Sequence, residues 1–210
     1  AIEKTGQEHP LTLVASGGYG RGVLNPGSDI DLQFLVPGSS HNLPECVTDT
    51  VNHFSTFLFD LGLDVSYPVR SIKEACKLAN KDHQTKTTLL DARFIFGDKE
   101  LFDEFEEAFF DTCIRGHEKS YLADRSKDIR SRHKKYGNTI HLQEPNAKEG
   151  CGGLRDFHNL IWVLWVLRKS RDLKALVKEG QLSQIAYDEI MEASKFLMRV
   201  RNELHYSQKG

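Results

Sequence analysis

The sequence lacks a long apolar run and any excess of basic charge. Its longest apolar stretch, residues 160–167, is far shorter than the roughly 18 residues that a membrane-spanning helix needs, so no membrane segment is expected. The 28 Lys and Arg residues are opposed by 30 Asp and Glu residues, which gives a formal net charge of -2. No global positive field is therefore present to attract nucleic acid, and no nucleic-acid partner is expected.

Paired cysteines and closely spaced histidines are also missing. None of the four cysteines belongs to a CxxC pair, so neither a zinc site nor a disulfide framework is predicted. Scattered reduced thiols are typical of a cytoplasmic protein, and this is the expected location. None of the nine histidines shows HxxxH spacing, which leaves a metal-hydrolase reading without support. Because the chain begins with Ala1, it is expected to be a piece of a longer protein.

The first part of the sequence predicts a small sheet with one long helix. Residues 11–16 are a short apolar run that suits a buried strand, and a glycine-rich turn follows it. Residues 29–36 alternate between polar and apolar side chains, as in a strand with one buried face. Residues 43–61 have helical spacing of apolar side chains, and residues 63–69 read as a third strand.

Beyond Ser71 the pattern becomes helical. Ser71 and Glu74 form a capping-box sequence, and helical periodicity dominates as far as residue 135. A long glycine-containing break at residues 136–155 precedes two or three further helices. The expected fold is therefore α+β: a domain with a small mixed sheet over residues 1–110, followed by an all-helical domain over residues 111–210.

The segment with the clearest chemistry is residues 16–34, SGGYGRGVLNPGSDIDLQF. Asp29 and Asp31 stand two positions apart on a predicted strand, so their side chains share a face with β-carbons about 7 Å apart. Two carboxylates so placed can hold Mg²⁺ together with substrate phosphate oxygens, and Mn²⁺ is a possible substitute. The cation can then activate an attacking oxygen and neutralise a leaving pyrophosphate.

The preceding turn supplies groups that can bind a triphosphate. At Gly17 and Gly18 the backbone can approach a ligand closely and offer its N–H groups. Arg21 can neutralise phosphate charge through its guanidinium, and Ser28 can add a hydroxyl. A pair of aspartates on the solvent face of an edge strand, or a glycine-rich turn, is common by itself. The conjunction of both at this spacing is much more specific and indicates a nucleotide-binding site.

This segment resembles the signature of the DNA polymerase β-like nucleotidyltransferase superfamily, and GGYGRG…NPGSDIDLQF is similar to the protein-PII uridylyltransferases in particular. Two stretches, FDLGLDVSYPVRS and TLLDARFIFGD, resemble the middle of that family's transferase domain. A third, EPNAKEGCGGLRD at residues 144–156, resembles the motif that opens its helical domain.

The resemblance implies an enzyme that transfers UMP from UTP to a tyrosine of the PII nitrogen-regulatory protein and releases pyrophosphate. It also implies an HD phosphohydrolase domain and ACT domains in full-length members, and this chain has no His-Asp dipeptide. Val23 and Cys151 stand where the family usually has Glu and Pro. Two alternatives therefore remain open: adenylyl transfer by an enzyme of related type, and a non-catalytic nucleotide-binding regulatory module.

Further residues complete the expected site. A third carboxylate can serve as metal ligand and general base; Asp64 on the predicted third strand is preferred, with Asp91 and Asp60 as alternatives. Lys148 and Arg155 lie in the long loop and are expected to bind nucleotide, because a loop of that length is often functional. Arg201 and His205 share one face of the last helix, which is predicted to be solvated.

Overall fold

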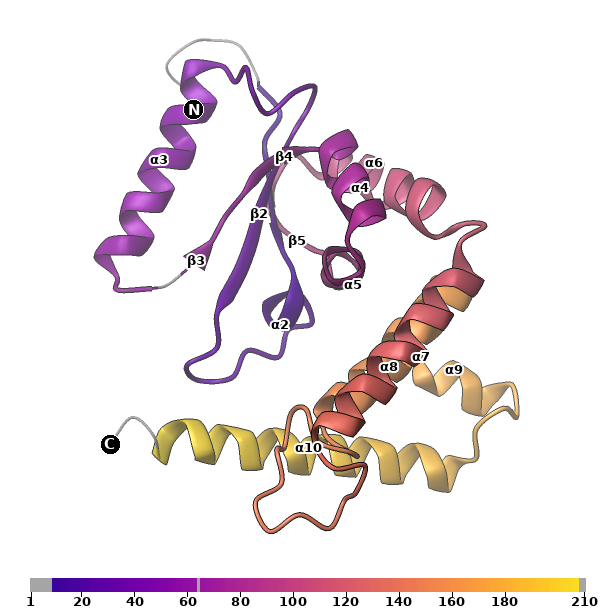
Figure 1. The fold of residues 1–210 in the computed structure, drawn as a ribbon. Helices are drawn as coiled ribbons and strands as arrows, with labels where there is room; N and C mark the ends of the chain where they lie inside the picture. The colour runs from indigo at the N-terminus through magenta and orange to yellow at the C-terminus, as the bar shows by residue number, and fades with distance from the viewer. Residues whose placement is uncertain (1–8, 64, 208–210) are drawn as a thin grey trace. The chain divides into compact units, whose positions relative to one another are not determined.

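The computed structural model describes residues 9–63 and 65–207, and the chain divides into two compact units (Figure 1). The first unit ends at Arg115 and leaves out the short segment Asn25–Gly27. The second unit consists of Asn25–Gly27 together with the chain from Gly116 onward.

The first unit is built around a mixed sheet with strand order β3-β2-β1-β5, in which β4 also pairs with β2. Strand β1 lies antiparallel to both β2 and β5, whereas β3 and β4 run parallel to β2. The strands are β1 (Thr12–Ala15), β2 (Ile30–Val36), β3 (Val65–Ser66), β4 (Val69–Ser71) and β5 (Arg93–Gly97). This arrangement confirms the small mixed sheet of an α+β fold.

The predicted third strand is divided into two short strands that pair with successive parts of β2. Ile30 and Asp31 are opposite β3, and Phe34 to Val36 are opposite β4. The division falls at Tyr67–Pro68, where proline has no N–H to donate to a sheet. The carbonyl of Pro68 still accepts a hydrogen bond of 2.9 Å from the N–H of Phe34, so the strand pair stays aligned across the break.

Helices pack on this sheet through aromatic side chains. The helices in the described part of the first unit are α2 (Gly17–Gly20), α3 (Glu45–Asp60), α4 (Ile72–Lys81), α5 (His83–Leu90), α6 (Lys99–Phe109) and the π-helical turn η1 (Phe110–Ile114). Phe34 of β2 meets Phe54 of α3 edge to face, with ring centroids 5.4 Å apart. Phe94 of β5 meets Phe102 of α6 at 5.9 Å. The predicted capping box of Ser71 and Glu74 is confirmed at the start of α4.

Two details of the first unit differ from the sequence prediction. Strand β2 is buried on both faces from Leu32 to Val36, because it is a central strand covered by helices, and only its first two residues are partly exposed. Strand β5 lies in a stretch that was expected to be helical. It pairs with β1 in the register Ala15↔Arg93, which places the end of α5 beside the glycine-rich turn.

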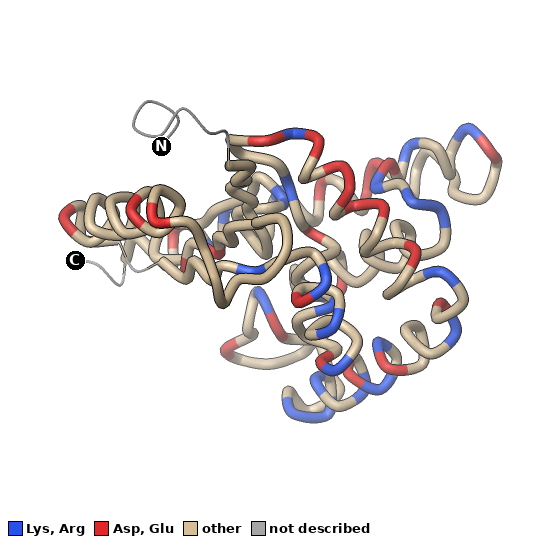
Figure 2. Tube along the Cα trace, turned by 90° about the horizontal axis from the view of Figure 1, so that it is seen from above, with Lys and Arg blue, Asp and Glu red and all other residues tan. Residues whose placement is uncertain are grey.

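The described part of the second unit contains helices α7 (Glu118–Lys135), α8 (Leu154–Arg168), α9 (Leu173–Lys178) and α10 (Gln184–Ser207). Helix α8 packs against α7 and α10, and α9 packs against α10. Trp162 and Trp165 are buried in this helical core. Figure 2 shows acidic and basic residues interspersed along the trace of both units.

Candidate active site

The two predicted metal ligands lie at the entrance to β2. Asp31 is the second residue of the strand and is partly exposed, and Asp29 directly precedes the strand and is exposed. The carbonyl of Asp31 accepts a hydrogen bond of 2.9 Å from the N–H of Ser16, at the end of β1. The antiparallel pairing of β1 and β2 therefore brings the first carboxylate-bearing residues next to the glycine-rich turn.

The glycine-rich turn is one turn of helix, α2, and not the plain tight turn that the sequence suggested. Ser16 precedes it in extended conformation, and its carbonyl accepts a hydrogen bond of 2.8 Å from the N–H of Gly20. The first N–H groups of any helix have no acceptor within the helix. In α2 these groups belong to Gly17, Gly18 and Tyr19, and the first two are the residues predicted to bind a triphosphate.

Gly17 and the carboxylate of Asp31 are in direct contact. Gly17 has φ +54°, and a β-carbon at this position would come within 2.4 Å of Oδ2 of Asp31. A side chain on residue 17 would therefore have to displace the carboxylate. The structure thus brings together two of the features on which the sequence prediction depended, the aspartate pair and the glycine-rich turn.

Asp91, which precedes β5, and Arg93, the first residue of β5, lie against the C-terminal end of α2. The carbonyl oxygen of Asp91 lies so close to Gly20 that a β-carbon on residue 20 would be only 2.1 Å from it. Arg93 donates hydrogen bonds to the carbonyls of Gly20 (3.0 Å) and Tyr19 (2.8 Å), which are at the end of the helical turn. Its guanidinium also lies over the Tyr19 ring, 5.3 Å from the centroid. Sequence reasoning missed Arg93, because no local pattern links it to a turn more than seventy residues earlier.

Arg21, predicted to bind phosphate, forms an ion pair with Asp91. The Arg21 side chain is 16% exposed and that of Asp91 only 1% exposed. Asp91, one of the alternatives for the third carboxylate, is therefore a buried partner of Arg21 in this structure. Asp60, the other alternative, is exposed at the end of α3.

Two further polar residues, Ser28 and Gln33, lie close to the aspartate pair in the sequence. Ser28 is partly exposed and lies two residues before β2 begins. Gln33, which shares the alternation of Asp29 and Asp31, is 2% exposed and accepts a hydrogen bond of 2.9 Å from Arg70. Burial lowers the pKa of Arg70, and the nearby charge of Glu74 opposes this effect.

The preferred third carboxylate, Asp64, lies outside the described residues. Within residues 9–63 and 65–207, no three His, Cys, Asp or Glu side chains gather in an arrangement that could hold a metal ion. Only Asp29 and Asp31 of the three predicted ligands lie in these ranges. The role of Asp64 stays a prediction.

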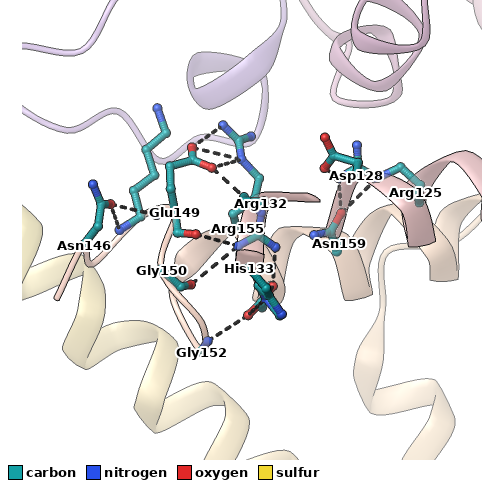
Figure 3. A network of polar contacts seen from close by, with 12 residues as sticks. Arg125, Asp128, Arg132, His133, Asn146, Glu149, Gly150, Gly152, Arg155 and Asn159 are labelled. Carbon is teal, nitrogen blue, oxygen red and sulfur yellow. Dashed lines mark hydrogen bonds and ion pairs between the residues drawn. The ribbon is translucent and has the colours of Figure 1, made fainter. Parts of the chain in front are cut away.

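The long loop between α7 and α8 belongs to the second unit and carries a polar network (Figure 3). Arg155 donates a hydrogen bond of 2.9 Å to Glu149, with which it forms an ion pair. The carbonyl of Lys148 accepts a hydrogen bond of 2.9 Å from the N–H of Arg155. The loop thereby covers the N-terminus of α8, and the nucleotide-binding roles of Lys148 and Arg155 remain predictions.

Asp156 connects this loop to α7. Its carboxylate accepts hydrogen bonds from Arg132, from His133 (3.0 Å) and from the N–H of Gly152 (2.8 Å). Burial opposes ionisation of Asp156, but the bonds from Arg132, Gly152 and His133 outweigh it and hold its pKa below the ordinary value. Arg132 also donates to the carbonyl of Glu149 at 2.7 Å. These contacts hold the loop in place, although its sequence predicted no regular secondary structure.

A buried tryptophan lies beneath the same network. The guanidinium groups of Arg125 and Arg155 are 5.0 and 5.6 Å from the ring centroid of Trp162, which is 3% exposed. Contacts of this kind between a guanidinium and an indole are favourable, and more so when they are shielded from water. Burial lowers the pKa of Arg125. Trp162 therefore supports the ends of two arginine side chains as well as the helix core.

No helix in the described ranges, 9–63 and 65–207, has the length and apolar character to cross a membrane. A family model described as GlnD PII-uridylyltransferase matches residues 121–210. Three curated relatives carry the description bifunctional uridylyltransferase/uridylyl-removing enzyme. The protein from Novosphingobium aromaticivorans is 37% identical over 195 residues, that from Erythrobacter litoralis 36% over 195 and that from Bradyrhizobium sp. 35% over 196.

Each of these alignments covers 93% of this chain and 21% of the relative, so the chain spans about a fifth of the length of the curated relatives it matches. The aligned part of this chain includes both the glycine-rich turn with its aspartate pair and most of the helical part, because each alignment covers 93% of the chain. The chain is therefore homologous to one region of the bifunctional uridylyltransferase/uridylyl-removing enzymes.

Proposed function

We propose that this chain is a nucleotidyltransferase that transfers UMP from UTP to a tyrosine of a PII-type signalling protein and releases pyrophosphate. The observation that carries the proposal is the contact of the Asp31 carboxylate with Gly17 at the first turn of α2. It sets a cation-binding oxygen beside backbone that can face a triphosphate. The small mixed sheet is compatible with a nucleotidyltransferase domain of polymerase β type, and the relatives named above support uridylyl transfer.

The donor set fits Mg²⁺. Asp29 and Asp31 offer carboxylate oxygens, which Mg²⁺ prefers, and both are accessible to solvent. Mg²⁺ held there supplies positive charge that stabilises the phosphate oxygens and the leaving pyrophosphate. Mn²⁺ has the same preference for oxygen and is expected to substitute.

The protein's own groups position the reactants. The N–H groups of Gly17 and Gly18 hold phosphate oxygens, and Ser28 adds a hydroxyl donor. Asp64 accepts the proton of the acceptor tyrosine as general base. Arg21 adds positive charge at the edge of the turn. Holding the hydroxyl in line with the phosphorus atom is the main source of rate in such transfers.

Isosteric substitution of the carboxylates tests the proposal. Asp29→Asn and Asp31→Asn keep the side-chain size but weaken cation binding, so both should abolish UMP transfer and pyrophosphate release. Asp49→Asn is the matched control, since it removes an exposed carboxylate on α3 that has no assigned role in the site. The assay uses labelled UTP, Mg²⁺ and a PII-type protein, with melting temperatures measured for each variant.

Three outcomes separate the proposal from its alternatives. If either active-site variant still releases pyrophosphate at the wild-type rate, the assigned role is wrong. If the wild-type chain binds UTP and Mg²⁺ in calorimetry but transfers nothing, the regulatory-module alternative replaces the enzyme. If ATP outcompetes UTP as the donor, the reaction is adenylyl transfer.

A further inference from the structure

Two of the four cysteines lie together in the core of the first unit. Cys76 is on α4, and Cys113 is in the π-helical turn η1, 37 positions later in the chain. Cys76 is 7% exposed and Cys113 is 0% exposed. All four cysteines are free thiols in this structure. In the sequence they are only scattered residues, so the fold alone makes these two neighbours.

The two thiols interact directly. Sγ of Cys113 donates a hydrogen bond of 3.5 Å to the carbonyl oxygen of Cys76, and the thiol of Cys76 is hydrogen-bonded to that of Cys113. A disulfide joins sulfur atoms on β-carbons that are about 3.8 Å apart. Two thiols that are already in hydrogen-bond contact need little more than rotation of their side chains to reach this geometry.

Side chains of α4 and α5 hold η1 in place from two sides. Asn80 of α4 donates a hydrogen bond of 3.1 Å to the carbonyl of Thr112, and Lys86 of α5 donates one of 2.9 Å to the carbonyl of Cys113. The last carbonyls of a helix have no hydrogen-bond donor within it, so these two bonds supply partners that η1 itself cannot provide. The contact between the thiols therefore rests on a fixed backbone.

The two thiols differ in acidity. The hydrogen bond from Cys76 lowers the pKa of Cys113; burial opposes this effect, while a contact with Thr112 and the charge of Lys86 add to it. The same hydrogen bond, together with burial, raises the pKa of Cys76. The thiolate is the form of cysteine that attacks an oxidant. Cys113 is therefore expected to react first and Cys76 second.

Cys113 is close to solvent although its own side chain is buried. Asp111 and Thr112 directly precede it and are exposed, and Arg115 is exposed two positions later. The turn η1 is also the last helical element of the first unit. Local opening costs least at the ends of a compact unit, so a molecule as small as hydrogen peroxide can reach Sγ of Cys113 through this turn.

We propose that Cys76 and Cys113 are a redox-active thiol pair that hydrogen peroxide oxidises to a disulfide. The Cys113 thiolate attacks one peroxide oxygen, so that an S–O bond forms, the O–O bond breaks and hydroxide leaves, which takes up a proton to become water. The Cys76 thiol then attacks the sulfenic sulfur of Cys113. The S–S bond forms, the S–O bond breaks, and the sulfenic hydroxyl leaves as water with the proton of Cys76.

In total the two thiols lose two protons and two electrons, and the peroxide is reduced to two waters. The product ties α4 to η1 across 37 positions of chain, which restricts the unfolded state and so stabilises the first unit. This inference goes beyond the proposed transfer and does not depend on it, because neither cysteine has a role in the transferase site.

The test maps the thiols of the 210-residue chain before and after treatment with hydrogen peroxide. Remaining thiols are alkylated, and the digested peptides are measured by mass spectrometry. The expected product is a linked pair of peptides that contain Cys76 and Cys113, two hydrogens lighter than their sum, which dithiothreitol separates again. Treatment in urea should give about fivefold less of this pair or lower still, because an open chain must first close a long loop.

Variants separate the roles of the two sulfurs. Cys76→Ala leaves the sulfenic acid of Cys113 without a partner, so dimedone should trap about fivefold more of it than in the wild type. Cys113→Ala removes the first sulfur and should leave Cys76 as a thiol. Cys46→Ala is the matched control, since it removes a partly exposed thiol of α3, and it should form the linked pair in the wild-type amount.

Thermal unfolding reports the effect on stability. The oxidised wild-type chain should melt about 5–10 °C above the reduced chain, as a cross-link over such a loop implies. Neither variant of the pair should show this shift on oxidation, and Cys46→Ala should show it in full. An oxidised wild-type chain that melts at or below the temperature of the reduced chain would contradict the stabilising role.

Other results would overturn the pair itself. If both thiols are still alkylated in full after peroxide treatment, they are ordinary small side chains of the core. A link to Cys46 or Cys151, or a sulfinic acid at Cys113 in place of the link, would equally refute the proposal. If a variant of the pair does not fold, the mapping of the wild-type chain decides alone. Failure of UMP transfer would refute the proposed function and leave the thiol measurements untouched.

Discussion

The α-carbon of Gly17 packs against the carboxylate of Asp31, so closely that a β-carbon there would be 2.4 Å from Oδ2. The two residues are 14 positions apart in the sequence, and the antiparallel pairing of β1 with β2 brings them together. On the side of residue 17 the contact is made by the backbone alone. The candidate site therefore requires glycine at this position.

Replacement of Gly17 by alanine should therefore abolish UMP transfer. Ala at φ +54° is strained by about 1–2 kcal/mol, and its methyl group must also displace Asp31. Gly22→Ala is the matched control: its φ is +74°, but a β-carbon there meets nothing within 4 Å. Gly17→Ala should lose at least as much stability in urea unfolding as Gly22→Ala, and only Gly17→Ala should lose activity, by about a hundredfold. Equal activity in the two variants would contradict the role given to this contact.

The ion pair of Arg21 with Asp91 should contribute strongly to the stability of the first unit. Because Asp91 is 1% exposed, Arg21→Ala removes the charge that balances a buried carboxylate and should lower the free energy of unfolding by about 3 kcal/mol. A double-mutant cycle of Arg21→Ala and Asp91→Ala measures the coupling. The double variant should be less destabilised than the sum of the single variants. Additive losses would show that the pair contributes nothing.

The Asp156 network predicts a pH dependence for the stability of the second unit. Its hydrogen bonds from Arg132, Gly152 and His133 outweigh burial and lower the pKa of Asp156. The stabilisation is therefore fully present above the unfolded pKa of about 3.9 and is lost as the pH falls below it. Asp156→Asn should cost about 1–3 kcal/mol at pH 6 and less at pH 3. Urea unfolding at both pH values checks this, and a difference that grows toward acid would contradict it.

The parts of the site that local patterns specify were predictable. The alternation of residues 29–36 predicted a strand, and the apolar run before the glycine-rich turn predicted another; the two are β2 and β1, which pair with each other. The capping box at Ser71 was equally readable, because all its groups lie within four residues. In each case the interacting residues are close in sequence or follow a fixed period.

What the sequence could not predict depends on contacts between distant residues. Strand β5 was read as helix because its three consecutive apolar residues, Phe94–Phe96, have no decisive period, and its pairing with β1 is a contact between residues far apart in the sequence. Four residues with three glycines have low helix propensity, yet α2 is helical, and Arg93 from a distant strand donates hydrogen bonds to its last two carbonyls. The face of α10 that was predicted to be solvated is partly buried at His205, whose contact with Pro26 spans 179 positions and leaves no local signal.

The path of the chain also limits how this protein can be divided. Since the first unit is interrupted at Leu24 and resumes at Ser28, no single peptide-bond cleavage releases it intact. A fragment that ends at Arg115 would keep Asn25 but would lose α10, to whose Asn202 that side chain donates a hydrogen bond, exposing an asparagine that evolved for an interior position. Dissection of the two halves is better attempted with α10 supplied in trans than by simple truncation.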